Sequence, residues 1–287
     1  MRLKQKNAVV YAILAAVLYG ISAPFSKILL QQIPETVMAS VLYIGAGVGM
    51  SILYLFKNKS QENSGYEKIK QSDYKYVLGM ILLDILAPIL LMLGLSRTTS
   101  ANASLLNNFE IVATSIIALV IFKEQISKKM WAAIILITIS SIVLSFEGNG
   151  TFQFSIGSLY ILGGCMCWGL ENNCTRVLSV KNPIIIVIIK GFGSGIGSLL
   201  VSFLLRQICT NFTYIIFALI LGFISYGLSI YYYVKAQKDL GAAKTSAYYA
   251  IAPFVGAFVS VIVFRGDFTM NFFVGLIIMI IGTYFAS

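Results

Sequence analysis

The 287-residue chain contains no histidine and few charged residues, and both shortages narrow what it can do. Without histidine, the commonest metal ligand and the commonest general base are missing. Only 11% of the residues are charged, against about 25% in a soluble domain, and 58% are hydrophobic. The composition therefore disfavours a soluble enzyme, and we expect no catalytic site, metal site or cofactor.

The four cysteines do not suggest a disulfide framework or a zinc site. Cys165, Cys167 and Cys174 lie in one apolar stretch, where cysteine usually acts as a small buried hydrophobe. The chain has no G-x-x-x-x-G-K-[ST] loop, so direct use of ATP is not expected. Met1–Lys6 leads directly into an apolar stretch without a convincing cleavage site, so we expect no removed signal peptide.

Long apolar stretches, joined by short polar connections, make up most of the chain. A membrane helix needs about 20 mostly apolar residues, because the hydrocarbon core is about 30 Å thick and each residue rises about 1.5 Å. The sequence therefore predicts an all-α integral membrane protein with ten transmembrane helices. The predicted ranges are 7–29, 36–56, 74–95, 102–122, 130–146, 156–178, 184–205, 213–234, 244–264 and 271–286.

The formal net charge of +10 is concentrated in alternate connections, which indicates membrane orientation and not a nucleic-acid partner. Cytoplasmic connections carry an excess of Lys and Arg, so we expect both termini of this multi-pass protein on the cytoplasmic side of the cell membrane. We expect contact with membrane lipid, and a monomer or homodimer. The basic residues assigned to the cytoplasm are Arg2, Lys4, Lys6, Lys57, Lys59, Lys68, Lys70, Lys75, Lys123, Lys128, Lys129, Arg176, Lys181, Lys235, Lys238 and Lys244.

Three short motifs recur in the same order in the two halves of the chain. Each half holds five predicted spans, an odd number, so the halves must run in opposite directions through the membrane. This predicts inverted repeats, residues 1–150 and 151–287, an architecture that places the substrate between the halves of secondary transporters. The Gly-xxx-Gly spacings also predict close helix packing. The matched motifs are Tyr19-Gly20 with Trp168-Gly169, Gly45, Gly47 and Gly49 with Gly193, Gly195 and Gly197, and Ile121–Glu124 with Val263–Gly266.

With these repeats and a closing Gly275…Gly282 pattern, the chain resembles EamA-type members of the drug/metabolite transporter superfamily over essentially its whole length. The resemblance implies ten helices around a central cavity lined by both halves. A Glu-Pro pair is common in span four of that family and in its counterpart. Here Glu110-Ile111 stands in one half and Ala252-Pro253 in the other, which leaves Glu110 without a symmetry mate.

Three acids, Asp84, Glu110 and Glu171, lie within predicted spans. A charge at bilayer depth costs at least about 2.5–3.5 kcal/mol on insertion scales, so each acid should face a cavity or a partner. Structural alternatives exist: an ion pair or a helix-to-helix hydrogen bond for Glu110, an ion pair with Lys190 or Arg176 for Glu171, and backbone groups freed by Pro88 for Asp84. We predict all three as proton-coupling groups, because a carboxylate in such a cavity can bind and release a proton.

Acids combined with aromatic side chains bind an ammonium group by charge and by cation–π attraction, while a base such as Lys190 suits a carboxylate. The sequence therefore predicts a secondary active transporter for a small polar metabolite, an amino acid or a small amine, working by alternating access with optional proton coupling. A passive uniporter or channel and, given Lys27 and Lys190, a carrier of organic anions are the alternatives. The predicted substrate-binding residues are Asn107, Glu110, Trp168, Glu171, Asn172, Lys190, Tyr226, Tyr248 and Tyr249.

Overall fold

The computed structural model describes residues 2–56, 66–122, 127–145, 155–240, 245, 248–265 and 269–286, and most of them are helical. Lys57, Lys59, Lys123 and Lys244, which the charge pattern assigns to the cytoplasm, lie outside these ranges. Glu124 and Gly266 of the repeated motif also lie outside them. The helices are α1 (Arg2–Gly20), α2 (Ser22–Leu29), α3 (Glu35–Phe56), η1 (Gln71–Asp73), α5 (Tyr74–Arg97), α6 (Ser100–Leu106), α7 (Phe109–Phe122), α8 (Lys128–Ser145), α9 (Ile156–Leu178), α10 (Pro183–Leu204), α11 (Phe212–Gly222), η2 (Phe223–Leu228), α12 (Ser229–Leu240), α14 (Ala252–Phe264) and α15 (Met270–Ala286).

The predicted apolar stretches coincide with helix over their described residues, but some of them are interrupted. The stretch 7–29 is divided at Ile21 between α1 and α2, and the stretch 102–122 is divided at Asn107 and Asn108 between α6 and α7. Asparagine side chains compete with the backbone for hydrogen bonds, which disfavours them in a helix interior. Asn107 and Glu110 therefore do not belong to one continuous helix.

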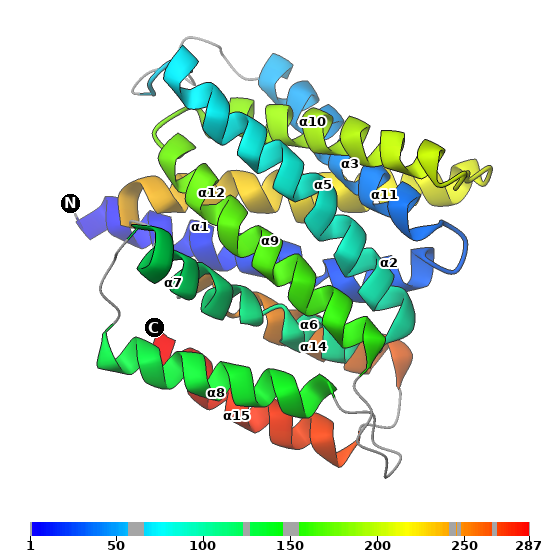
Figure 1. Ribbon diagram of the computed structural model, residues 1–287. Coiled ribbons are helices and arrows are strands. Elements are labelled where there is room, and N and C mark those ends of the chain that lie inside the picture. The colour runs from blue at the N-terminus through cyan, green and yellow to red at the C-terminus, as the bar shows by residue number, and fades with distance from the viewer. Residues whose placement is uncertain are drawn as a thin grey trace.

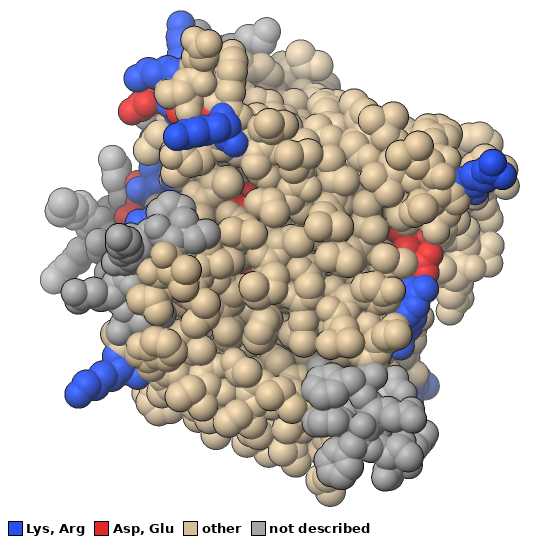
Figure 2. All heavy atoms as spheres, viewed as in Figure 1, with Lys and Arg blue, Asp and Glu red and all other residues tan. Residues whose placement is uncertain are grey.

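The outer surface suits an apolar surrounding. Five described segments are long and apolar enough to cross a membrane, and α14 and α15 are shorter apolar helices. Figure 2 shows Lys, Arg, Asp and Glu gathered at two opposite edges, with a broad uncharged face between them. Large apolar side chains such as Leu55, Phe56 and Leu204 are 71%, 86% and 82% exposed. Exposed apolar surface on this scale is typical of contact with lipid. The five segments are Lys6–Leu29, Glu35–Phe56, Gln71–Arg97, Pro183–Leu204 and Phe212–Leu240.

The helices pack mainly against helices that are distant in sequence. Helix α3 packs on α10, α5 on α9, α1 on α12, and α8 on α15 (Figure 1). The α8–α15 pair lies along one edge of the assembly, and both chain termini lie at the same end, on the left in Figure 1. Most helices of the first half of the chain thus pack against a helix of the second half.

Glycines permit the closest of these approaches, as the Gly-xxx-Gly spacings predict. A Cβ atom added to Gly191 of α10 would lie 2.5 Å from the backbone nitrogen of Gly47 in α3. A Cβ atom added to Gly45 of α3 would overlap the backbone of Leu219 in α11. No side chain fits at either point unless the helices move apart.

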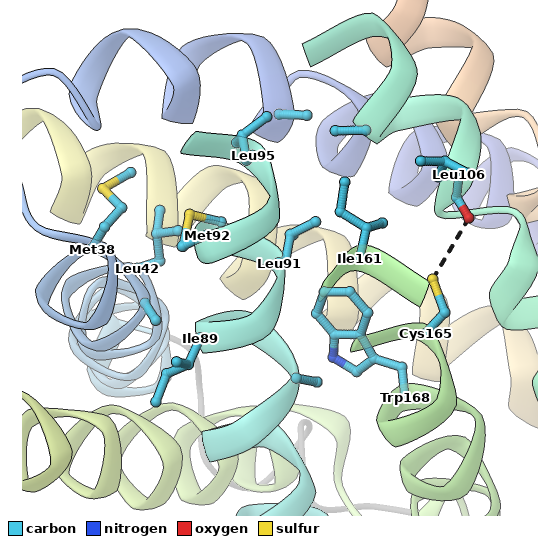
Figure 3. Close-up of a cluster of buried hydrophobic side chains, with 14 of the residues drawn as sticks. Met38, Leu42, Ile89, Leu91, Met92, Leu95, Leu106, Ile161, Cys165 and Trp168 are labelled. Carbon is cyan, nitrogen blue, oxygen red and sulfur yellow. Dashed lines mark hydrogen bonds between the residues drawn. The ribbon is translucent and has the colours of Figure 1, made fainter. Parts of the chain in front are cut away.

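The largest hydrophobic cluster among the described residues extends through most of the helices, and Figure 3 shows the part of it that surrounds α5, between α3, α6 and α9. Met38 and Leu42 of α3 lie on one side of α5, and Ile161 and Trp168 of α9 lie on the other. Trp168 is 7% exposed and belongs both to this core and to the polar site described below. The core therefore fixes the indole of Trp168 in position.

Charged side chains form contacts between the ends of different helices. Lys181, in the connection between α9 and α10, places its Nζ 3.1 Å from Glu67 Oε2 and 3.0 Å from Asp73 Oδ2. The hydrogen bond to Asp73, with help from Glu67, raises the pKa of Lys181. Lys27 of α2 instead donates to the carbonyl oxygens of Leu95, at 2.6 Å, and Ser96, at 3.1 Å, and so caps the end of α5.

Candidate functional site

A buried lysine lies between two acids inside the helical assembly. Lys190 Nζ of α10 is 2.9 Å from Asp84 Oδ2 of α5 and 3.1 Å from Glu171 Oε1 of α9. Lys190, Asp84 and Glu171 are 5%, 0% and 2% exposed. Charges removed from water need close partners, so these contacts explain how three charged residues lie within apolar helices. The ion pair between Glu171 and Lys190, one of the predicted alternatives, is confirmed.

Neutral donors orient both acids. The Tyr43 hydroxyl donates to Asp84 Oδ1 at 3.0 Å, and Trp168 Nε1 donates to the same oxygen at 3.1 Å. The Thr175 hydroxyl, one turn further along α9, donates to Glu171 Oε1. Each carboxylate is therefore held by donors in addition to Lys190, and its direction is set before any ligand arrives.

Glu110 is placed by the break between α6 and α7. Helix α6 ends at Leu106 and α7 begins at Phe109, so Glu110 lies in the first turn of α7, where the helix dipole favours an acid. At the break, the Cys165 thiol donates to the Leu106 carbonyl at 3.6 Å (Figure 3). Asn172 Nδ2 donates to Glu110 Oε1 at 2.5 Å. Within the described ranges Glu110 forms no ion pair, unlike the other two acids.

These groups surround a cavity of about 60 Å³. A space of this size holds several water molecules. Its wall is made from the first half of the chain through α1, α3 and α7, and from the second half through α9, α10, η2 and α12. The lining residues are Tyr19, Tyr43, Glu110, Trp168, Glu171, Asn172, Thr175, Lys190, Tyr226, Ile230, Tyr233 and Tyr249.

Aromatic rings form much of this wall. The Tyr19 ring centroid lies 5.7 Å from that of Tyr226, 5.8 Å from Tyr249 and 6.5 Å from Trp168. The Tyr43 and Tyr226 centroids are 5.1 Å apart. These spacings fall within the range of favourable aromatic pairs, so the rings support one another. The faces of such rings attract cations.

Tyr226 reaches the cavity through an irregular turn. It belongs to η2, a π-helical segment inside the otherwise α-helical stretch Phe212–Leu240. Gly222, just before this segment, packs directly against the backbone of Leu42 in α3. Single π turns are rare and are frequent at functional sites. The sequence pattern of this apolar stretch does not predict the π turn.

Most of the predicted binding residues meet at the cavity. Asp84 lies just behind its wall and contacts Tyr43, Trp168 and Lys190. Asn107 lines a separate hole of about 10 Å³, and Tyr248 is 38% exposed and is not part of the cavity wall. Roles in binding or proton transfer stay predictions for all of them. The predicted residues that line the cavity are Glu110, Trp168, Glu171, Asn172, Lys190, Tyr226 and Tyr249.

Five lining residues were absent from the predicted site: Tyr19, Tyr43, Thr175, Ile230 and Tyr233. Tyr19 belongs to a repeated motif, but that motif alone does not indicate a cavity. Tyr43 offers a usable signal, because its hydroxyl lies within an apolar span and must find a polar partner there. Ile230 and Tyr233 lie in α12, directly after the π turn, and no pattern in the sequence marks them.

The charges at the site do not balance. Asp84, Glu110 and Glu171 supply three carboxylates, and Lys190 supplies one ammonium. Within the described ranges, no cluster of His, Cys, Asp and Glu could hold a metal ion. A buried site with surplus acid attracts cations, either protons or an organic ammonium group.

The chain is similar to known proteins in sequence and in fold. The profile of the EamA-like transporter family matches residues 6–146 and 155–287. An uncharacterized transporter of Methanothermobacter thermautotrophicus is 27% identical over 288 residues, which cover 95% of this chain and 83% of that protein. A solved crystal structure aligns over 98% of this chain and 96% of its own, with a TM-score of 0.72 and 13% identity. At that identity the likeness shows the fold alone.

Proposed function

The chain belongs to the EamA-like transporter family, and from this premise we propose that it is a secondary active transporter of a small polar metabolite carrying an amino group. The substrate class is an amino acid or a small amine. Transport proceeds by alternating access, and the substrate binds in the cavity lined by Glu110, Glu171 and the aromatic rings. The observation that carries the proposal is the surplus of buried acid within an aromatic wall.

The proposed architecture has ten membrane helices in two inverted halves, residues 1–150 and 151–287. The helix contacts support it, because they come in related sets. Exchanging the halves turns the contact of α5 with α9 into that of α12 with α1, α7 with α9 into α14 with α1, and α3 with α11 into α10 with α5. The contacts of α3 with α10, α6 with α14 and α8 with α15 map onto themselves. A pseudo-two-fold axis produces this pattern.

Matching interruptions in the two halves also support the inverted repeat. The α6–α7 stretch is broken at Asn107 and Asn108, and the segment leading into α14 is turned at Ala250 and Ile251. Helices α6 and α14 pack together, so the two interruptions belong to neighbouring segments. Discontinuous helices near the bilayer midplane are typical of transporter binding sites.

The proposed orientation places both termini in the cytoplasm at the cell membrane. Both ends of the chain lie at the same end of the assembly (Figure 1), as an even number of spans requires. Most Lys and Arg residues belong to the connections on that side in the predicted topology. Protease or label access from one side of sealed vesicles measures this directly.

Proton coupling is proposed to use Glu110, Glu171 and Asp84. A carboxylate that alternates between a proton and an ammonium group links transport of one to transport of the other. Glu110 is the best placed for such exchange, because it lines the cavity and the one hydrogen bond to its carboxylate among the described residues comes from the neutral Asn172. Glu171 and Asp84 share Lys190, so their protonation is tied to the position of that lysine.

The test is counterflow in proteoliposomes that contain the purified chain. Vesicles loaded with an unlabelled amine or amino acid should accumulate the labelled form transiently, at a rate that saturates and depends on pH. Glu110→Gln and Glu171→Gln should lower that rate at least tenfold. Glu35→Gln is the matched control, because Glu35 lies outside the cavity and pairs with Arg97 at an exposed helix end.

Three results would contradict the proposal. Normal transport with normal pH dependence in both glutamine variants would remove the acids from the mechanism. Fast flux without saturation or counterflow would indicate a channel. Equal losses in Glu35→Gln and in the two cavity variants would show that the effect is not specific to the site.

A further inference from the structure

We infer that the cavity selects a small organic cation without a carboxylate, in preference to an amino acid. This inference rests on the proposed function and narrows its substrate class. Its basis is the pairing of the charges at the cavity. The base that could receive a carboxylate is already held by two acids, and one acid is left for an ammonium group.

The single positive charge of Lys190 is already shared by two acids. Its Nζ contacts Asp84 at 2.9 Å and Glu171 at 3.1 Å, and the residue is 5% exposed. Asp84 is further fixed by Tyr43 and Trp168, so it does not follow the lysine into the cavity. A substrate carboxylate would therefore either crowd a third negative charge against one buried ammonium or displace one of these acids and leave it buried without its partner. Both are strongly unfavourable.

No second base compensates. Among the described residues that line the cavity, Lys190 is the only Lys or Arg. An entering carboxylate would meet Glu110 and Glu171 in a confined space and would be repelled by both. Like charges brought together in this way act against the wrong ligand, which is how binding sites often reject close analogues.

Glu110, in contrast, is suited to an ammonium group. Within the described ranges its carboxylate accepts one hydrogen bond, from Asn172, and forms no ion pair. Tyr19 and Tyr249 line the same cavity, with ring centroids 5.8 Å apart. A cation beside Glu110 gains both a counter-charge and nearby aromatic faces.

The cavity volume favours a compact ligand. About 60 Å³ accommodates several water molecules, which corresponds to a short amine in place of that water. The remaining wall is mostly aromatic. Its rings bury the hydrocarbon part of such a ligand, and its tyrosine hydroxyls can accept or donate a hydrogen bond.

The experiment uses matched pairs of ligands that differ only by the carboxylate. Isothermal titration calorimetry of the purified full chain in detergent would measure ethanolamine against serine, isobutylamine against valine, and tyramine against tyrosine. In each pair that binds, we expect the amine to bind at least tenfold more tightly than the amino acid. Glu110→Gln should weaken amine binding at least tenfold, and Glu35→Gln should leave it unchanged.

A second variant tests the role assigned to Lys190. Glu171→Gln leaves this lysine with one acid, so a substrate carboxylate can compete for it. We expect the preference for the amine over its amino acid to fall by at least threefold in this variant. Thermal unfolding of each variant checks that it folds, and an unchanged or larger preference in folded Glu171→Gln would overturn the assignment.

The results that would overturn this inference differ from those that would overturn the proposed function. Amino acids that bind as tightly as their amines, with loss of both in Glu110→Gln, would overturn the selectivity and leave the amino-group transporter standing. Amines that bind normally in Glu110→Gln would overturn the ammonium site assigned to Glu110. Absence of binding by all six ligands, together with absence of counterflow, would overturn both.

Discussion

Replacing Lys190 by methionine should destabilise the protein more than any other single change at the site. Methionine has a similar length and removes only the charge and its two contacts, at 2.9 and 3.1 Å. Asp84 and Glu171 would stay buried, 0% and 2% exposed, without their shared cation. Removing one partner of a buried pair costs about 3–5 kcal/mol, because the other charge is left uncompensated.

The expected loss of stability in Lys190→Met is large because the site can relax little. Asp84 keeps its hydrogen bonds from Tyr43 and Trp168, but these are neutral donors and do not offset the lost charge. One kcal/mol shifts the unfolding midpoint by about 2–4 °C in proteins of 150–250 residues, so a drop of roughly 10 °C is expected. Thermal unfolding in detergent, followed by tryptophan fluorescence, measures it.

The double variant Lys190→Met with Asp84→Asn separates charge from packing. Asparagine keeps an oxygen for Tyr43 and Trp168 and removes one uncompensated charge, so the double variant should melt above Lys190→Met alone. Coupling energies for such contacting pairs are about 0.5–3 kcal/mol. A Lys190→Met midpoint within 2 °C of the parent (roughly 1 kcal/mol), or losses that simply add in the double variant, would refute the reasoning.

Two further predictions concern packing and the connections. Gly222→Ala places a Cβ against the backbone of Leu42 and should lower the free energy of unfolding by about 1–3 kcal/mol. Gly163→Ala is the control: the nearest atom to its added Cβ is 3.4 Å away, so this variant should be neutral or slightly stabilising. Equal thermal unfolding midpoints for the two variants would contradict the assigned α3–α11 contact. The pKa of Lys181 is raised mainly by the hydrogen bond to Asp73. The contribution of this ion pair to the stability of the protein is therefore complete below the ordinary lysine pKa of about 10.4, and it disappears as the pH rises through the higher pKa of the folded state. Lys181→Met should therefore melt below the parent at pH 8, and the difference should shrink above pH 10.4; a difference independent of pH would exclude the ion pair as its cause.

The helices could be predicted from the sequence, because lipid leaves the backbone few alternatives. An apolar stretch must satisfy its own hydrogen bonds, so length and hydropathy are sufficient to locate a helix. The same reasoning misses the breaks at Ile21 and at Asn107, since apolar residues continue on both sides of each break. A break depends on local competition for backbone hydrogen bonds and on the neighbouring helix, and hydropathy contains neither.

The charged part of the site was predictable for a related reason. A buried charge is so unfavourable in an apolar span that Glu110, Glu171 and Lys190 mark a polar interior by their presence alone. The aromatic wall was predicted only in part, because tyrosine is common at span ends as well as in cavities. Tyr248 and Tyr249 illustrate the limit: they are adjacent in sequence, yet only Tyr249 lines the cavity.

The two ion pairs of Lys190 differ in what they connect. Glu171 of α9 and Lys190 of α10 both belong to the second half of the chain, whereas Asp84 of α5 belongs to the first. In the proposed alternating motion the pair with Glu171 can therefore travel with its own half, while the pair with Asp84 crosses the boundary and must stretch or break. Glu110 also belongs to the first half. A cation bound to it adds a positive charge to the same half as Asp84, so Asp84 depends less on its ion pair with Lys190. Ligand binding and loosening of the boundary are thus expected to be electrostatically coupled through Lys190.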